Sequence, residues 1–139
     1  MKIRDIMTNS VIRIDPEENV AVAARTLAHY NIGALPVCST NGRLCGVVTD
    51  RDIVTRCLAS GRAPTKTTIR DVMSGSLVCA TPDMEVTEAA ELMGTHQVRR
   101  LPVLEGGKLC GMVSLGDLAG AKNAGNTLTM ISSNISSRK

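Results

Sequence analysis

Aromatic residues are nearly absent from this chain of 139 residues, which contains no Trp, no Phe and a single Tyr, Tyr30. Its core must therefore be packed from aliphatic side chains and Met, and any planar ligand must be held without aromatic stacking. Proteins that bind single-stranded nucleic acids usually stack the bases on aromatic rings. The shortage of aromatic residues therefore argues against that class of function.

The chain also lacks a strong net charge and long apolar runs. Its 16 basic residues are interspersed with 13 acidic ones, which gives a formal charge of +3 and predicts no nucleic-acid or membrane surface. The segment MKIRDIMTNS is too polar for a secretory signal, and no apolar stretch approaches the roughly 20 residues that span a bilayer. We expect a cytoplasmic protein without a membrane partner.

Cysteine and histidine spacings typical of metal sites are missing as well. The five cysteines form no C-x-x-C pair, and several of them lie in apolar runs. His29 and His96 have no carboxylate or cysteine at ligand spacing. The sequence therefore predicts no metal site, and the cysteines are interpreted as small buried residues in a reducing compartment.

What the chain does contain is an internal repeat. The segment IRDIM at residues 3–7 returns as IRDVM at residues 69–73, an offset of 69 − 3 = 66. The triplet LPV at residues 35–37 returns at 101–103 with the same offset. After a one-residue deletion, LCGVVT is followed by Asp52 in the first copy, and LCGMVS is followed by Asp117 in the second.

Both copies predict the same order of elements, which is strand, helix, strand, strand, helix, and hence an α/β (α+β) fold. A short extended segment, at 11–14 and again at 77–80, precedes a Pro and an Ala-rich stretch with helical spacing. Two strand-length apolar runs then flank Asn41-Gly42 or Gly106-Gly107, which are hairpin signals.

The repeat also predicts the domain organisation. We expect repeat 1 at residues 1–60, a linker at 61–68, repeat 2 at 69–121 and a partly flexible tail at 122–139. A single repeat would bury too little surface to be stable alone. The two repeats are therefore expected to pack as one module with pseudo-twofold symmetry.

Two short elements carry the residues best suited to chemistry. Thr49 and Asp52 follow a buried strand and open a helix, and Ser114 and Asp117 do the same in the second repeat. Backbone N–H groups at a helix start can hold phosphate oxygens, and a nearby carboxylate can accept hydrogen bonds from a sugar diol. The same spacing resembles a capping box with Asp in place of Glu or Gln. Because the element occurs in both repeats, a ligand-binding role is favoured, but helix capping alone also explains each copy.

Over about residues 2–120 the chain resembles the CBS (cystathionine-β-synthase-like) repeat family. The motifs that carry this resemblance recur in both halves in the same order: the IRD[IV]M segment, the Pro, the Ala-rich helix, the LPV triplet and the G[VM]V[TS]xxD element. The resemblance implies a non-catalytic regulatory module that senses energy state or a metabolite. It implies two pseudo-equivalent sites in the cleft between the repeats, for AMP, ADP, ATP or S-adenosylmethionine. It also implies a homodimer, in which the apolar helices of the repeats are buried.

The same resemblance suggests residues for these sites. It implies that Thr49 and Asp52 serve one site, that Ser114 and Asp117 serve the other, and that each Asp binds the ribose while each hydroxyl lies near the phosphates. The adenine would be enclosed by backbone and aliphatic side chains. These lie near Ile32, Gly33 and Ala34, near Val98, Arg99 and Arg100, and in the extended segments at residues 10–12 and 76–78, which include Ile12 and Val78.

The two sites are not expected to be equal. Arg51 lies inside the first element, where the second has Gly116, and Arg99-Arg100 replace Gly33-Ala34. Arginine is suited to bidentate contact with phosphate, so we expect these three arginines to set the phosphate selectivity. Plain surface charge is the alternative interpretation of each.

Two other functions are open at this point. A small nucleotide hydrolase would use Asp52 or Asp117 with a histidine, but the sequence has no grouping of nucleophile, base and orienting residue. A nucleic-acid-binding protein would use Arg99-Arg100 and the basic residues at 62, 66 and 70, and its affinity would fall steeply with salt. Because no effector domain is recognisable, we expect any regulated partner to be a separate protein.

Overall fold

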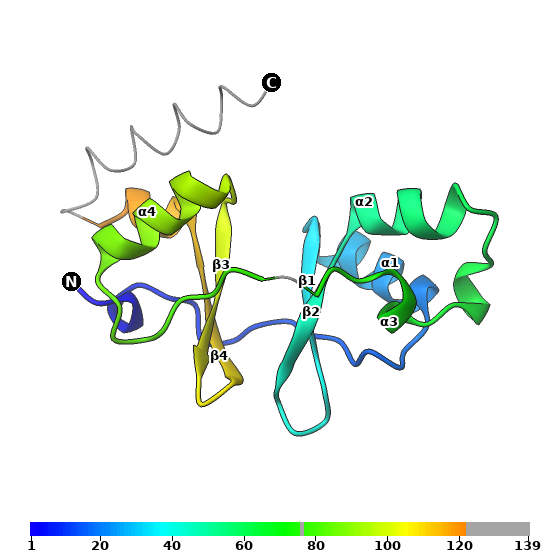
Figure 1. Cartoon of the computed structure of the whole chain (residues 1–139), viewed down its shortest axis with the longest axis horizontal. Helices are drawn as coiled ribbons and strands as arrows, with labels where there is room; N and C mark the ends of the chain where they lie inside the picture. Colours follow the sequence, from blue (N-terminus) through cyan, green and yellow to red (C-terminus); the bar gives the residue numbers. More distant parts are fainter. Residues whose placement is uncertain (76, 122–139) are drawn as a thin grey trace. The chain divides into compact units, whose positions relative to one another are not determined.

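The computed structural model of the chain describes residues 1–75 and 77–121. They form two compact units (Figure 1). Unit 2 is the continuous segment Ile12–Leu77, and unit 1 combines Met1–Val11 with the chain from Val78 onward. The predicted tail at 122–139 lies outside the described residues.

Unit 2 is centred on an antiparallel hairpin of two strands, and helices precede and follow it. In chain order its elements are α1 (Val20–Tyr30), β1 (Ala34–Cys38), β2 (Leu44–Thr49), α2 (Asp50–Asp52), the π-helix η2 (Ile53–Leu58), the 3-10 helix η3 (Pro64–Lys66) and α3 (Ile69–Val72). η2 follows α2 without a break, so the two form one helical segment.

Unit 1 repeats this plan. Its elements are the 3-10 helix η1 (Ile3–Asp5), α4 (Val86–His96), β3 (Arg100–Glu105), β4 (Lys108–Ser114) and α5 (Leu115–Ala119). β3 and β4 pair antiparallel, as β1 and β2 do in unit 2. The mixed helix and strand fold predicted from the sequence is therefore confirmed.

Local sequence explains where the long helices begin and end. Asn19 caps α1 by accepting a hydrogen bond from Val22 N at 3.1 Å. Asn31 and Gln97 end α1 and α4 in the left-handed conformation, with φ of 52° and 55°. In the first hairpin, Gly42 supplies the positive φ of 86° that the turn requires. The hairpin turn thus forms where Asn41-Gly42 predicted it.

Each unit has its own apolar core, and the two cores use equivalent positions of the repeat. In unit 2 the helix residues Val20, Ala23 and Leu27 pack with the strand residues Leu35 and Val48. The equivalent core residues in unit 1 are Val86, Ala89, Met93, Leu101 and Val113. Aliphatic side chains therefore fill both cores, as the shortage of aromatic residues predicts.

The compact units do not coincide with the sequence repeats, because each IRD[IV]M segment packs on the other repeat. Ile3 is fully buried in the core of unit 1, and its equivalent Ile69 is fully buried in the core of unit 2. Backbone hydrogen bonds hold both segments in place, between Thr8 and Met112 in unit 1 and between Ser74 and Val47 in unit 2.

Residues 61–68, expected to link the repeats, lie inside unit 2. Thr67 is only 3% exposed, and its carbonyl accepts a hydrogen bond from Val20 N at the start of α1. Ile69 N donates to Glu18 O at 2.8 Å. The chain instead passes between the units at Val11–Ile12 and again at Leu77–Val78, two positions related by the repeat offset.

The extended segments expected at 11–14 and 77–80 are reduced to single parallel bridges. These join Ile14 to Val37 of β1 and Ala80 to Val103 of β3. Pro16 and Pro82 follow two residues later and have no N–H group to continue a ladder. The bridges still fix the direction in which each segment runs along its hairpin.

Candidate functional site

The predicted ligand-binding residues form two sets, each contained in one unit. The unit 2 set consists of Ile12, Ile32, Gly33, Ala34, Thr49, Arg51 and Asp52, and the unit 1 set consists of Val78, Val98, Arg99, Arg100, Ser114 and Asp117. Of the predicted segment at 76–78, Ser76 lies outside the described residues.

Strand pairing brings the parts of each set together. In unit 2, Ala34 pairs with Thr49 at the end of the hairpin, and Asp50 N donates to Gly33 O at 3.0 Å. In unit 1, Arg100 pairs with Ser114, and Leu115 N donates to Arg99 O at 2.8 Å. The residues around 33 and 99 therefore lie directly beside the Thr/Ser-x-x-Asp elements.

The extended segments approach the same end of each hairpin. The bridge between Ile14 and Val37 is parallel, so the chain at Ile12 runs beside the beginning of β1. The bridge between Ala80 and Val103 places Val78 in the same way beside the beginning of β3. Ile12 is exposed and Val78 is half-buried. Aliphatic side chains thus flank both sets.

Both Thr/Ser-x-x-Asp elements form reciprocal capping boxes. Thr49 Oγ1 accepts a hydrogen bond from Asp52 N at 3.0 Å, and Asp52 Oδ2 accepts one from Thr49 N at 3.0 Å. Ser114 and Asp117 make the same two bonds at 3.1 and 2.8 Å. The capping interpretation is therefore correct for both copies, and each carboxylate has one oxygen beyond its cap.

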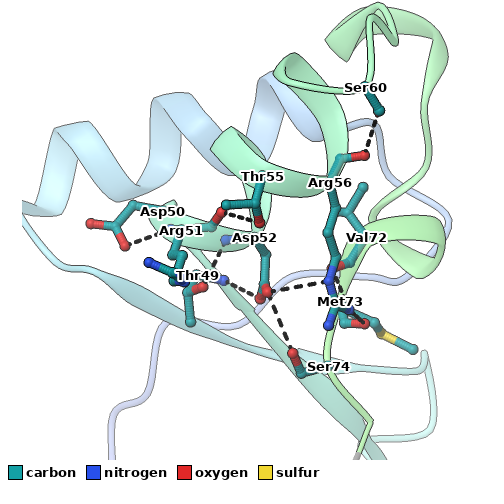
Figure 2. Close-up of polar contacts among 10 residues, drawn as sticks. All are labelled: Thr49, Asp50, Arg51, Asp52, Thr55, Arg56, Ser60, Val72, Met73 and Ser74. Carbon is teal, nitrogen blue, oxygen red and sulfur yellow. Dashed lines mark hydrogen bonds and ion pairs between the residues drawn. The ribbon is translucent and has the colours of Figure 1, made fainter. Parts of the chain in front are cut away.

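The second carboxylate oxygen distinguishes the two copies. Oδ1 of Asp52 lies 3.4 Å from the Ser74 hydroxyl, which donates to it, and 3.9 Å from Arg56 Nε (Figure 2). Oδ1 of Asp117 takes no hydrogen bond from another described residue. Asp52 is only 8% exposed, whereas Asp117 is half-buried.

The sequence at the equivalent positions accounts for the missing arginine but not for the missing hydroxyl. Ser74 corresponds to Thr8, since 74 − 66 = 8, and Arg56 corresponds to Ala121, since 56 + 65 = 121 after the one-residue deletion. Ala121 has no charge to offer Asp117. Neither Ser74 nor Arg56 was among the residues predicted for the site.

The charge around the two sets differs as well. Arg99 and Arg100 are exposed, and neither forms an ion pair with another described residue. In unit 2 the equivalent residues are uncharged, and Asp50 takes the place of Leu115. A Cβ at Gly33 would lie 3.6 Å from an Asp50 carboxylate oxygen. Asp50 was missed as a site residue, although its position directly after Thr49 was the available signal.

Arg51 is also exposed and without an ion pair among the described residues. Its backbone N donates to Asp50 Oδ1 at 2.8 Å. In sequence, Arg51 of the first element stands between Asp50 and Asp52, whereas the second element has the single carboxylate of Asp117, with Arg99 and Arg100 on the segment that pairs with it.

The cysteines and histidines form no metal-binding group within residues 1–75 and 77–121, where no cluster of three or more His, Cys, Asp or Glu side chains occurs. Cys38 and Cys57 are buried, as predicted, whereas Cys45, Cys79 and Cys110 are only partly buried. Burial raises the pKa of Cys38 and of Cys79 above the usual thiol value, which keeps both protonated at neutral pH. No helix in the described part of the chain is long and apolar enough to cross a membrane.

An apolar groove of about 340 Å³ lies on the helical side of unit 2, and it is lined in part by Ile32 of the unit 2 set and by Asp50. Its lining residues are Ala24, Leu27, Ala28, Asn31, Ile32, Asp50, Ile53 and Val54. Tyr30, Val54 and Leu58 in the same helices, α1 and η2, are 49%, 55% and 54% exposed. These three residues and the groove are called the α1/η2 face below.

Comparisons with known proteins agree with the repeated architecture. The CBS domain model matches this chain twice, at residues 3–59 and 69–123. The CBS domain-containing protein YhcV of Bacillus subtilis is 41% identical over 134 residues, which cover 94% of each chain. Hypoxic response protein 1 of Mycobacterium tuberculosis is 37% identical over 116 residues, 84% of this chain and 81% of that protein.

Solved structures show the same fold. The crystal structure of Hypoxic Response Protein I with two coordinated zinc ions is 36% identical, with a TM-score of 0.79 over 86% of this chain and 98% of that one. The CBS domain pair of protein MJ0100, in complex with 5-methylthioadenosine and S-adenosyl-L-methionine, is 26% identical, with a TM-score of 0.74 and the same coverage. The chain therefore belongs to the CBS domain family and carries two CBS repeats.

Proposed function

We propose that this protein is a non-catalytic regulatory module that binds an adenosyl ligand at the unit 1 set. The candidate ligands are AMP, ADP, ATP and S-adenosylmethionine. A single observation carries the proposal. The Asp117 carboxylate keeps one oxygen without a partner among the described residues, and the backbone beside its cap belongs to two exposed arginines, Arg99 and Arg100, that form no ion pair there. The adenosyl ligands of the MJ0100 domain pair support the same ligand class.

The unit 1 set offers a distinct contact for each part of a nucleotide. Asp117 Oδ1 accepts a hydrogen bond from a ribose hydroxyl, while Oδ2 stays on the cap. Arg99 and Arg100 bind phosphate oxygens. Val78 and Val98 cover the adenine ring, which this chain must hold without aromatic stacking. Ser114 fixes the position of Asp117 through the cap.

Such a ligand acts by linkage rather than by chemistry. A bound ligand shifts a conformational equilibrium only as far as it prefers one state over the other. The protein then reports the concentration of the ligand to a separate regulated protein. Catalysis would require a base that takes the proton of a nucleophile, whereas in the unit 1 set the Asp117 carboxylate accepts from the Ser114 backbone N and the Ser114 hydroxyl accepts from the Asp117 backbone N.

The α1/η2 face supports self-association into a homodimer. Its three large side chains are each about half exposed, and one of them, Val54, lines the apolar groove. An exposed apolar patch of this kind usually marks an interaction surface. Burial of this face against the same face of a second copy would remove Tyr30, Val54 and Leu58 from water.

A thermal-shift screen tests the ligand proposal. The purified chain is heated with AMP, ADP, ATP, S-adenosylmethionine and, as base controls, GMP and GTP. A ligand that binds only the native state raises the unfolding midpoint by mass action. At least one adenosyl compound is expected to raise the midpoint in a concentration-dependent manner while the guanine nucleotides do not. If no adenosyl compound raises it, the proposed function is wrong.

A further inference from the structure

Asp52 and Asp117 are equivalent in sequence and in their caps, but their remaining carboxylate oxygens have different surroundings. Asp52 belongs to a polar cluster that joins two segments of unit 2 (Figure 2). Its Oδ1 accepts a hydrogen bond from Ser74, and its charge faces Arg56. Arg56 Nη1 in turn donates to Val72 O at 3.3 Å and Met73 O at 3.1 Å.

This cluster ties the end of α3 and the residues after it to the helical segment formed by α2 and η2. Arg56 contacts both sides, because it donates to two carbonyls of one segment and faces the carboxylate of the other. The carbonyl oxygen and backbone N of Ser74 are at the same time bonded to Val47 of β2. Asp52 thus lies at the meeting point of three elements of unit 2.

A ligand hydroxyl would have to displace Ser74 from Oδ1 in order to bind Asp52. It would also have to reach a side chain that is only 8% exposed, and it would weaken the attraction to Arg56. At Asp117 no described hydroxyl or guanidinium has to be displaced. Equivalent contacts with the same ligand therefore cost more at Asp52 than at Asp117.

The charged residues of the two sets also favour ligand binding at the unit 1 set over the unit 2 set. Asp50 lies beside Gly33 and adds a second carboxylate to the unit 2 set, where the unit 1 set has the apolar Leu115. With Asp50, the unit 2 set holds two carboxylates and one guanidinium, whereas the unit 1 set holds one carboxylate and two guanidinium groups. The unit 2 set is thus the poorer site for a phosphorylated ligand.

We infer that the two elements have separate roles: Asp52 is a latch residue that fastens residues 72–74 to the α2–η2 helix, and Asp117 alone binds ligand, so that one adenosyl ligand binds per chain. This inference rests on the proposed function for its ligand half. The latch half stands on the contacts of Asp52 and is measurable without any ligand.

The matched variants Asp52→Asn and Asp117→Asn test both halves. Each substitution removes the charge of a capping carboxylate, so the difference between the variants reports the different surroundings of the two carboxylates, including Ser74 and Arg56. Without ligand, thermal unfolding is expected to show a midpoint that is roughly 3–6 °C lower for Asp52→Asn than for Asp117→Asn. Equal midpoints, or a lower midpoint for Asp117→Asn, would overturn the latch.

Isothermal titration calorimetry with AMP, ATP and S-adenosylmethionine tests the ligand half of the inference. We expect one ligand per wild-type chain, a loss of affinity of about tenfold or more in Asp117→Asn, and a change of less than about twofold in Asp52→Asn. Two ligands per chain, or a loss in Asp52→Asn as large as in Asp117→Asn, would overturn the assignment. If none of the three compounds binds wild type, the proposed function fails together with the ligand half, and the unfolding midpoints still decide the latch.

Discussion

Gly46 on β2 lies against the backbone of Ser74, so closely that a Cβ at position 46 would come within 2.5 Å of the Ser74 carbonyl oxygen. The equivalent Gly111 on β4 lies against Met7 and Thr8, with the Met7 sulfur 2.7 Å from such a Cβ. These contacts are where each IRD[IV]M segment packs on the other repeat.

Gly46→Ala is therefore expected to destabilise the protein by about 2 kcal/mol, because the backbone at Ser74 must move to make room. Gly111→Ala should cost less, since the nearest atom there belongs to the flexible Met7 side chain. Chemical denaturation measures both changes. Gly75→Ala is the matched control, because a Cβ at Gly75 meets nothing within 4 Å. Equal stability of all three variants would contradict the packing described for both segments.

The exchange of segments predicts which fragment of the chain folds. A peptide of residues 12–77 contains the whole of unit 2, including Ile69 and Val72 of its core. A peptide of residues 1–60, the first sequence repeat, lacks both. Because only the first peptide keeps a complete core, we expect it to show more helix and strand by circular dichroism and a more cooperative thermal transition than the second, even though a unit of this size has little stability of its own. Cooperative folding of residues 1–60 alone would contradict the division into units.

Much of this fold is predictable from the sequence, because its signals are local. The 66-residue offset identifies equivalent positions, helical spacing locates α1 and α4, and Asn41-Gly42 locates a hairpin turn. The exchange of the IRD[IV]M segments is not predictable in this way. The two IRD[IV]M segments have the same apolar pattern, so either one could pack on either repeat. The sequence repeat therefore shows which positions are equivalent, but not which repeat each segment packs on.

The candidate site is predictable to the same degree. Sequence identifies Thr49, Asp52, Ser114 and Asp117, and the structure shows the caps that were the alternative interpretation. The partner of Asp52 is Ser74, 22 residues away in a segment whose packing the sequence leaves open. Equivalent motifs therefore concealed unequal surroundings, and the only sequence signal of the difference is that Ala121 stands at the position equivalent to Arg56.

The arginines of the unit 1 set predict a preference for phosphorylated ligands. Arg100→Gln is expected to weaken ATP binding by about tenfold, because a hydrogen bond to a charged group is lost, and to leave adenosine binding unchanged. Lys108→Gln is the control, since it removes a positive charge from the far end of the same hairpin. Titration calorimetry compares the variants. Equal losses for Arg100→Gln and Lys108→Gln would reduce the role of Arg100 to general surface charge.

The α1/η2 face predicts that a single charge prevents dimer formation. Leu58→Asp places a carboxylate on an exposed position of η2, where it does not disturb the core of the monomer. Sedimentation velocity is expected to show a dimer for wild type and a monomer for the variant. Thr87→Asp is a control at an exposed position of α4 in unit 1. A wild-type monomer, or a Leu58→Asp dimer as stable as wild type, would exclude this face as the interface.

Calorimetric titration of the wild-type chain with AMP, ATP and S-adenosylmethionine, followed by chromatography of the recovered ligand, tests the central claim most directly. A non-catalytic adenosyl-binding module is expected to give saturable binding of at least one of the three compounds, and the bound compound should be recovered unchanged. Absence of saturable binding, or conversion of the recovered compound to a product, would contradict it.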